Sequence, residues 1–223
     1  MIITIDGPAG SGKSTVASLL SDKLNFIHLN SGSLYRALTC YLHSTHFNIP
    51  SITENFPTFD LNLEVKFIDN NQHTFVNGID FTDMLRDNII SQLAPFISAN
   101  KSLRETIDAC QKDFCSKHDV VLEGRDLGSF VFPNAEIKFY LDCSIKERAR
   151  RRYLEELNKN NIVSIEEIEK QIEKRDFTDK TKKIAPLVVP KDAVIIDSST
   201  LTIEQVLEAM ISVVENIKSK SNE

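Results

Sequence analysis

Eight residues close to the N-terminus combine three glycines with a lysine and two serines. The segment reads Gly7-Pro8-Ala9-Gly10-Ser11-Gly12-Lys13-Ser14 and matches the pattern G-x-x-x-x-G-K-[ST]. The backbone N–H groups of such a loop, together with the start of the following helix, can surround phosphate oxygens. We expect Lys13 to reach the β- and γ-phosphates of a nucleoside triphosphate and the Ser14 hydroxyl to bind Mg²⁺.

The residues on either side of this loop have the periodicity of a strand and a helix. Apolar residues dominate 1–6, recur at helical spacing over 13–24, and dominate again over 26–29. A strand, loop, helix and strand in this order begin a parallel α/β sheet. The alternative is a glycine-rich turn without a phosphate, and this context disfavours it because the full pattern is rare.

A second polar cluster follows the predicted strand over 26–29. Ser31 and Arg36 lie at the start of a predicted helix over 31–43, and their side chains suit an anionic acceptor. The alternative is that Ser31 or Ser33 caps this helix and that Arg36 is solvated.

A third cluster, Gly124-Arg125-Asp126, follows the apolar run over 120–122. Open α/β sheets bind ligands at the carboxyl ends of their strands, so these residues could contact a substrate. A surface turn with a local ion pair is the alternative.

Two other stretches are expected to lie outside the parallel sheet. Apolar and polar side chains alternate over 61–67, a polar turn follows at 69–72, and a second strand over 74–81 completes a predicted antiparallel hairpin in an inserted subdomain. Asn77-Gly78 is a dipeptide favoured in type I′ turns. Helical patterns fill 83–117, strands are predicted over 137–141 and 194–196, and a closing helix over 203–217.

Residues 145–183 are predicted to be mostly helical and are rich in basic side chains. These include Arg148, Arg150, Arg151, Arg152, Arg175, Lys180, Lys182 and Lys183. A solvated helical face is the usual explanation of such a pattern. In a phosphoryl-transfer enzyme, a basic lid that closes over two nucleotides would stabilise the transferring oxygens and exclude water.

The overall composition excludes several classes of protein. The 223 residues carry 26 Lys and Arg against 32 Asp and Glu, and this net charge of −6 argues against a nucleic-acid binder. No apolar run approaches the roughly 18 residues of a membrane span. The four scattered cysteines favour reduced thiols in the cytoplasm. A GTPase is excluded because D-x-x-G and N-K-x-D motifs are missing. A motor or transporter ATPase would need a larger chain or an obvious partner module, which leaves small-molecule kinases.

Taken together, these motifs resemble the bacterial cytidylate (CMP/dCMP) kinase family over nearly the whole chain. The matching segments are Ile5–Thr15, Ser31–Arg36, Gly124–Gly128 with Val131–Pro133, Glu147–Arg152, and Arg175–Asp176 through Ala185–Leu187. The resemblance implies ATP-dependent phosphorylation of CMP and dCMP in pyrimidine nucleotide metabolism, with Mg²⁺ as cofactor. From the charge and the apolar runs we expect binding of nucleotides but of neither nucleic acid nor membrane, and nothing in the sequence demands more than a monomer.

The fold that the resemblance implies is a P-loop nucleoside-monophosphate kinase of the α/β class. A central parallel sheet with flanking helices would carry an inserted antiparallel β subdomain for the monophosphate and a helical lid. The core would comprise 1–58, 118–144 and 184–217, the insert 59–117, and the lid 145–183.

The resemblance also implies roles for individual residues. Gly7 to Thr15 would bind ATP, with Lys13, Arg125 and Arg175 as the catalytic groups. Ser31 and Arg36 would bind the ribose and phosphate region of CMP, and Asp179 would bind its ribose. Arg104 and Asp126 would contact the cytosine edge. Arg125 and Arg175 would contact phosphate.

Two positions depart from the family pattern. Lys182 stands where the family has a phosphate-binding arginine, and lysine keeps the charge but loses the two-pronged geometry. Pro95 stands where relatives carry a serine that assists base recognition, and Ser98 is the nearest substitute. Two alternatives stay open: another nucleoside-monophosphate or small-metabolite kinase, and a non-catalytic ATP-binding regulator.

Overall fold

The computed structural model describes residues 1–52, 61–158 and 161–220. The chain forms two compact units, the first made of Met1–His28 with Val120–Glu223 and the second of Leu29–Asp119. The second unit takes in the described part of the predicted insert together with the preceding helix. The predicted boundary between residues 58 and 59 lies outside the described residues, as do 159–160 of the predicted lid and the last three residues of the tail.

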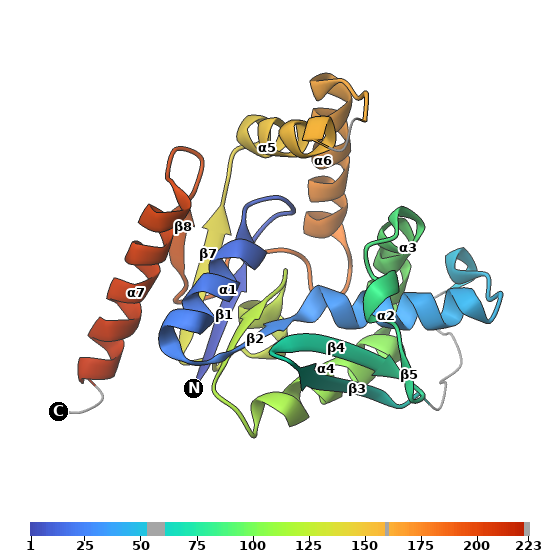
Figure 1. The fold of residues 1–223 in the computed structure, drawn as a ribbon, viewed down its shortest axis with the longest axis horizontal. Helices are drawn as coiled ribbons and strands as arrows, with labels where there is room; N and C mark the ends of the chain where they lie inside the picture. Colours follow the sequence, from blue (N-terminus) through green and yellow to red (C-terminus); the bar gives the residue numbers. More distant parts are fainter. Residues whose placement is uncertain (53–60, 159–160, 221–223) are drawn as a thin grey trace. The chain divides into compact units, whose positions relative to one another are not determined.

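A five-stranded parallel sheet organises the first unit (Figure 1). Its strand order is β2-β6-β1-β7-β8, so β1 is central and hydrogen-bonds to β6 on one side and β7 on the other. The strands are β1 (Ile2–Asp6), β2 (Ile27–Asn30), β6 (Val120–Glu123), β7 (Ile137–Asp142) and β8 (Val194–Asp197). The chain steps from β1 to β2 in one direction and reaches β7 in the other, and ligands bind at such switch points.

The main hydrophobic core lies between this sheet and two helices, α1 (Lys13–Leu24) and α7 (Ile203–Lys220). The two helices contact each other (Figure 1). Fully or nearly fully buried side chains come from the strands and from one side of each helix. They include Ile3, Ile5, Leu20, Phe139, Leu141, Met210 and Val214. The apolar residues at helical spacing over 13–24 therefore form the buried side of an amphipathic helix, as the sequence predicts.

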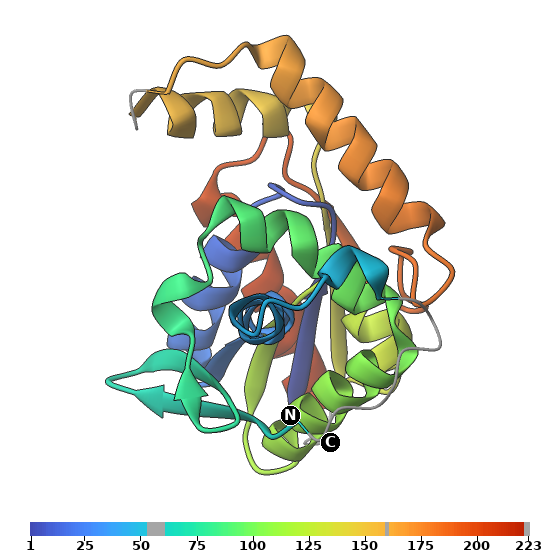
Figure 2. The ribbon, with the colours of Figure 1, turned by 90° about the vertical axis from the view of Figure 1, so that its right-hand side faces the viewer.

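Two further helices follow β7 in the first unit. They are α5 (Ile145–Asn158) and α6 (Ile165–Thr181), which pack on each other through Ala149, Ile168 and Ile172. Ser164 caps α6, because its hydroxyl accepts a hydrogen bond from the Glu167 N–H at 3.1 Å. Figure 2 shows α5 and α6 meeting at an angle.

The second unit is built from helices and an antiparallel sheet. In register, Leu63 pairs with Val76 and Val65 with Thr74, and α4 packs on β3 while α2 packs on β4. Its elements are α2 (Ser31–Ser44), β3 (Leu63–Ile68), β4 (Asn71–Val76), β5 (Ile79–Asp80), α3 (Asn88–Ala99) and α4 (Lys101–Cys115), with short helical turns at Ile49–Ser51 and Thr82–Met84. Asn77 and Gly78 both have positive φ, 49° and 78°, as a type I′ turn requires, and they divide the strand predicted over 74–81 into the end of β4 and β5.

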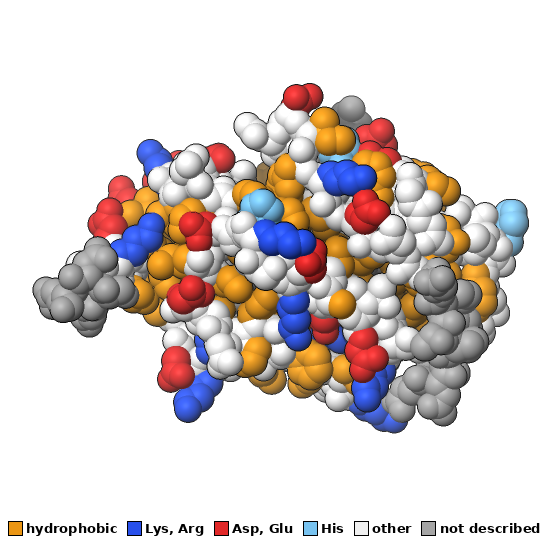
Figure 3. All heavy atoms as spheres, turned by 90° about the horizontal axis from the view of Figure 1, so that it is seen from below, with side chains coloured by type: hydrophobic (Ala, Val, Ile, Leu, Met, Phe, Trp, Pro, Cys, Tyr) orange, Lys and Arg blue, Asp and Glu red, His pale blue; other side chains and the backbone are white. Residues whose placement is uncertain are grey.

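Among the described residues, no helix combines the length and the apolar character that crossing a membrane requires. On the face drawn in Figure 3, acidic and basic side chains are interspersed over the described surface.

Candidate active site

The glycine-rich loop joins the end of β1 to the start of α1. Gly7 has φ 150°, and a Cβ at this position would clash with the Leu141 carbonyl oxygen in the neighbouring β7. Gly12 stands at the N-cap of α1 with φ 95°, a left-handed conformation that side chains disfavour. The loop therefore depends on glycine at both ends, and the N-terminus of α1 provides partial positive charge beside it.

Lys13 is folded back over its own loop and is only 5% exposed. Its Nζ donates to the Pro8 carbonyl oxygen at 2.6 Å and to Ser11 Oγ at 3.4 Å. Burial lowers the pKa of Lys13 well below its usual value, and the positive charges of Arg125 and Arg175 lower it further. The charges of Arg125 and Arg175 thus act unfavourably on the charge of Lys13, and a bound polyphosphate would offset this repulsion.

Glu123 is a site residue that the motif analysis missed. The Ser14 hydroxyl donates to Glu123 Oε2 at 2.7 Å, and His28 Nε2 lies 3.3 Å from Glu123 Oε1. Burial would raise the pKa of Glu123, but hydrogen bonds from His28 and Ser14 lower it overall, so the group is a carboxylate. The signal in the sequence is a buried apolar run that ends in a carboxylate at the carboxyl end of a parallel strand.

Ser14 and Glu123 together suit Mg²⁺, which prefers oxygen ligands and usually keeps few protein contacts besides substrate phosphates. Within the described residues, no group of three or more His, Cys, Asp or Glu side chains is placed to hold a metal ion by itself. A hydroxyl and one carboxylate at the phosphate-binding loop fit an ion that arrives with a nucleotide.

The turn after β6 brings other predicted residues of the first unit together. Arg125 Nε donates to Asp179 Oδ2 at 3.3 Å, and Lys182 Nζ lies 3.6 Å from Asp126 Oδ2. Asp126 is only 5% exposed, which is unlike a solvated surface turn. The last turn of α6 and the residue after it therefore contact the turn that follows β6.

The predicted acceptor residues of the second unit are Ser31, Arg36 and Arg104. Ser31 is buried in the first turn of α2, but Asn30 is the residue that caps this helix, because its Oδ1 accepts from the Ser33 N–H at 3.0 Å. The same oxygen lies 3.5 Å from Arg36 Nη2. The alternative raised by the sequence, a side-chain cap at Ser31 or Ser33, is therefore wrong in its residue, because the cap is Asn30.

Asn30 itself is held by a glutamine that the sequence did not identify. Its backbone N–H donates to Gln72 Oε1 at 2.7 Å, and Gln72 Nε2 donates to the Asn30 carbonyl at 3.3 Å. These paired bonds join the start of α2 to β4 and so help to place Arg36.

Arg104 projects from α4 and is 2% exposed. Its guanidinium carbon lies 5.7 Å from the centre of the Tyr35 ring, and its Nη1 donates to the Ser98 carbonyl at 3.5 Å. Pro95 is inside α3, and Ser98 Oγ donates to the Pro95 carbonyl at 2.9 Å. That Ser98 takes over base recognition stays a prediction, as does a single CMP site formed by the residues of both units.

The basic segment is not a uniformly solvated face. Arg148 is 3% exposed and donates to both carboxylate oxygens of Asp176, at 3.0 and 2.6 Å. Its Nη1 also donates to the carbonyl of Ala9 in the phosphate-binding loop at 3.1 Å. By contrast, Arg150 is exposed, and its hydrogen bonds, with those of Arg151, lower the pKa of Glu147 to about 2.

A family model and the curated relatives agree on one family. A family model described as cytidylate kinase matches residues 3–216. A cytidylate kinase of Geobacter sulfurreducens is 41% identical over 96% of this chain and 92% of its own, and that of Fervidobacterium nodosum is 41% identical over 96% and 95%. The cytidylate kinase of Caldicellulosiruptor saccharolyticus is 36% identical over 94% and 93%.

A solved structure shares the fold at much lower sequence identity. It is an uncharacterized protein from Eubacterium ventriosum, which is 12% identical, covers 96% of this chain and 98% of its own, and has a TM-score of 0.51.

Proposed function

This chain belongs to the cytidylate kinase family, and we propose that it transfers the γ-phosphoryl group of ATP to the phosphate of CMP or dCMP. An oxygen of the acceptor phosphate bonds to the γ-phosphorus, the bond between that phosphorus and the bridging oxygen breaks, and ADP leaves. The observation that carries the proposal is the phosphate-binding loop itself, in which the buried Lys13 donates to Pro8 and Ser11 and has a pKa lowered by the charges of Arg125 and Arg175.

Catalysis by these residues is positional and electrostatic. Negative charge spreads over the transferring oxygens in the transition state, and the three cations, with the backbone N–H groups of Gly7 to Thr15, are suited to stabilise it. Ser14 and Glu123 would hold Mg²⁺, which when bound neutralises charge on the β- and γ-phosphates.

The acceptor needs no general base. The second pKa of a phosphate monoester is about 6, so CMP arrives largely as a dianion at neutral pH. Ser31, Arg36 and Lys182 would bind this acceptor, and Asp179 its ribose. The α5–α6 pair would close over the nucleotides as a lid, which limits transfer to water.

Asp126 is suited to distinguish cytosine from uracil. A carboxylate accepts a hydrogen bond from the exocyclic amine of cytosine, whereas the uracil carbonyl at that position has no proton to donate. This mismatch should favour CMP over UMP by roughly 1–3 kcal/mol. Arg104 would contact the same base edge.

The enzyme is proposed to act as a monomer on free nucleotides, since nothing in the sequence demands an oligomer. We place it in the cytoplasm, where its four free cysteines would stay reduced.

ADP release measured with CMP, dCMP, UMP, AMP and shikimate in turn tests the proposal. CMP and dCMP should give the highest kcat/KM. A preference for another acceptor would indicate a different small-molecule kinase, and ATP binding without acceptor-dependent ADP release would indicate a regulator.

Asp126→Ala should lower kcat/KM for CMP by about 10- to 100-fold and kcat/KM for UMP by clearly less, since only CMP loses a hydrogen bond. Steady-state kinetics with both acceptors measure this difference. Asp22→Ala, at an exposed position of α1, is the control and should change neither value. Equal losses for the two acceptors would show that Asp126 does not contact the base.

A further inference from the structure

Asp6, the last residue of β1, is a fully buried carboxylate that the proposed reaction does not use. The Leu127 N–H donates to its Oδ1 at 2.9 Å, and the Gly128 N–H donates to its Oδ2 at 2.7 Å. Leu127 and Gly128 begin a single wide helical turn over Leu127–Val131. The first N–H groups of a helical turn lack partners within it, so Asp6 caps this turn from a different strand.

The residue at the start of this turn is Asp126. An aspartate at an N-cap commonly accepts hydrogen bonds from the N–H groups that follow it. Here the Asp126 side chain makes no such bond, and its Oδ2 lies 3.6 Å from Lys182 Nζ instead. Because Asp6 already occupies the two N–H groups, the carboxylate of Asp126 is directed toward Lys182, which follows α6.

The turn also approaches β1 closely, which fixes its position. A Cβ at Gly128 would lie 2.8 Å from Thr4 Oγ1 and 3.2 Å from the side chain of Lys138. Asp6 and Gly7 are adjacent in the chain, so the residue that caps the Leu127–Val131 turn directly precedes the phosphate-binding loop.

The charge of Asp6 is unfavourable for folding. Burial raises the pKa of Asp6 to about 6, and the charge of Asp126 acts in the same direction, against the two backbone hydrogen bonds and Lys13. A folded-state pKa above the unfolded value of 3.8 means that the ionised form is disfavoured by folding, so this group lowers stability as the pH rises through that interval. A neutral side chain would avoid this penalty, which points to a role other than stability.

We propose that Asp6 is a positioning residue: by capping the Leu127–Val131 turn in place of Asp126, it directs the Asp126 carboxylate toward the cytosine of the acceptor. This inference rests on the proposed function, in which Asp126 contacts the base. It assigns acceptor selectivity in part to the strand that leads into the ATP-binding loop.

Asp6→Asn tests the proposal, because asparagine has the same shape but turns one of the two acceptors into an NH₂ group that faces a backbone N–H. We expect kcat/KM for CMP to fall by about 10- to 100-fold, mainly through the KM for CMP. The KM for ATP should change little, and the ratio of CMP to UMP kcat/KM should approach that of Asp126→Ala. The thermal unfolding temperature of Asp6→Asn should fall much less than a loss of activity by unfolding would require.

The double variant Asp6→Asn/Asp126→Ala should have the same ratio of CMP to UMP kcat/KM as Asp126→Ala alone, since both changes remove the same contact with the base. Asp142→Asn is the matched control: Asp142 ends the neighbouring β7, and its Oδ1 accepts from the Cys143 N–H at 2.8 Å. This control should keep the selectivity of the unmutated enzyme.

An Asp6→Asn enzyme that loses activity equally with CMP and UMP, or an additive double variant, would overturn the proposal. Should Asp6→Asn fail to fold, Asp6→Ser carries the same expectation. Amide hydrogen exchange of the unmutated protein is an independent check, because the Leu127 and Gly128 amides must exchange slowly, and rapid exchange at both would overturn the proposed cap. Absence of CMP-dependent ADP release by the unmutated protein would instead refute the proposed function.

Discussion

Replacing Lys13 with alanine is expected to lower kcat with ATP and CMP by about 10³-fold. Its ammonium group is buried within the phosphate-binding loop, where we propose that the transferring oxygens gain charge. Removal of one preorganised charge at such a place affects the transition state more than the bound substrate. The decrease should therefore be larger in kcat than in the affinity for ATP.

The fold should survive this substitution. Burial lowers the pKa of Lys13, which means that its charge is disfavoured in the folded protein, and a neutral side chain removes that penalty. Thermal unfolding followed by circular dichroism should show a transition within a few degrees of that of the unmutated protein.

Two variants control for the loss of a lysine as such. Lys23→Ala changes an exposed lysine at the end of the same helix and should leave kcat unchanged. Lys13→Met keeps the length of the side chain and should be as inactive as Lys13→Ala. Turnover close to that of the unmutated enzyme in either Lys13 variant would remove this residue from the mechanism.

Local patterns in the sequence predicted most of the elements. The helix over 13–24, the strand over 137–141 and the antiparallel hairpin have short-range signals: apolar spacing, flanking turn residues and Asn77-Gly78. The predicted helical stretch over 83–117 is two helices in the structure. The break is at Asn100, whose Oδ1 accepts from the Leu103 N–H at 2.9 Å, and asparagine is a common capping residue.

The missed site residues depend on contacts between distant parts of the chain. Ser14 and Glu123 are 109 residues apart, and Asp6 and Leu127 are 121 residues apart. No local pattern relates such pairs, since they meet only because β1 and β6 are neighbours in the parallel sheet. The sequence predicted that both strands end near ligands, but not which strand lies beside which.

The basic segment shows that residues close together in the sequence can have different environments in the fold. Arg148, Arg150 and Arg151 are nearly adjacent, and the sequence alone does not distinguish them within the basic segment. In the structure, Arg148 is buried against Asp176, whereas Arg150 and Arg151 bind Glu147. The helical period separates them, and only packing against α6 decides which one is buried.

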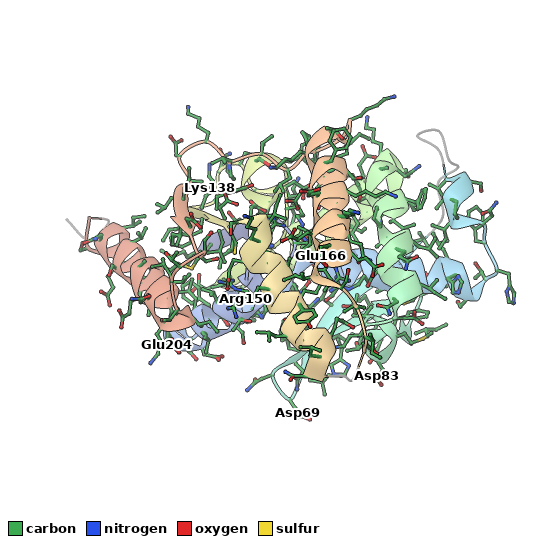
Figure 4. All side chains as sticks on the ribbon, turned by 90° about the horizontal axis from the view of Figure 1, so that it is seen from above. Asp69, Asp83, Lys138, Arg150, Glu166 and Glu204 are labelled. Carbon is green, nitrogen blue, oxygen red and sulfur yellow. The ribbon has the colours of Figure 1, made fainter. Side chains whose placement is uncertain are left out.

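Arg148→Met should destabilise the protein by about 3–5 kcal/mol, because it leaves the carboxylate of Asp176 buried without its partner. The guanidinium donates to Asp176 twice, to the Cys143 carbonyl at 2.9 Å and to the Ala9 carbonyl at 3.1 Å, so the variant loses all of these bonds. For a chain of this size the unfolding temperature should fall by about 6–20 °C. Arg150→Met, on the exposed side of the same helix, should have little effect on that temperature (Figure 4).

The double variant Arg148→Met/Asp176→Leu separates stability from function. Replacing both charges with apolar groups should recover most of the lost stability, since no unpaired charge remains. It should still turn over CMP more slowly than the unmutated enzyme, because the bond from Arg148 to Ala9 joins the phosphate-binding loop to α5, and the Arg148–Asp176 pair joins α5 to α6, the helix that carries Arg175. Calorimetry with steady-state kinetics on the single and double variants measures both effects. A double variant that regained full activity along with its stability would show that the pair acts on the fold alone.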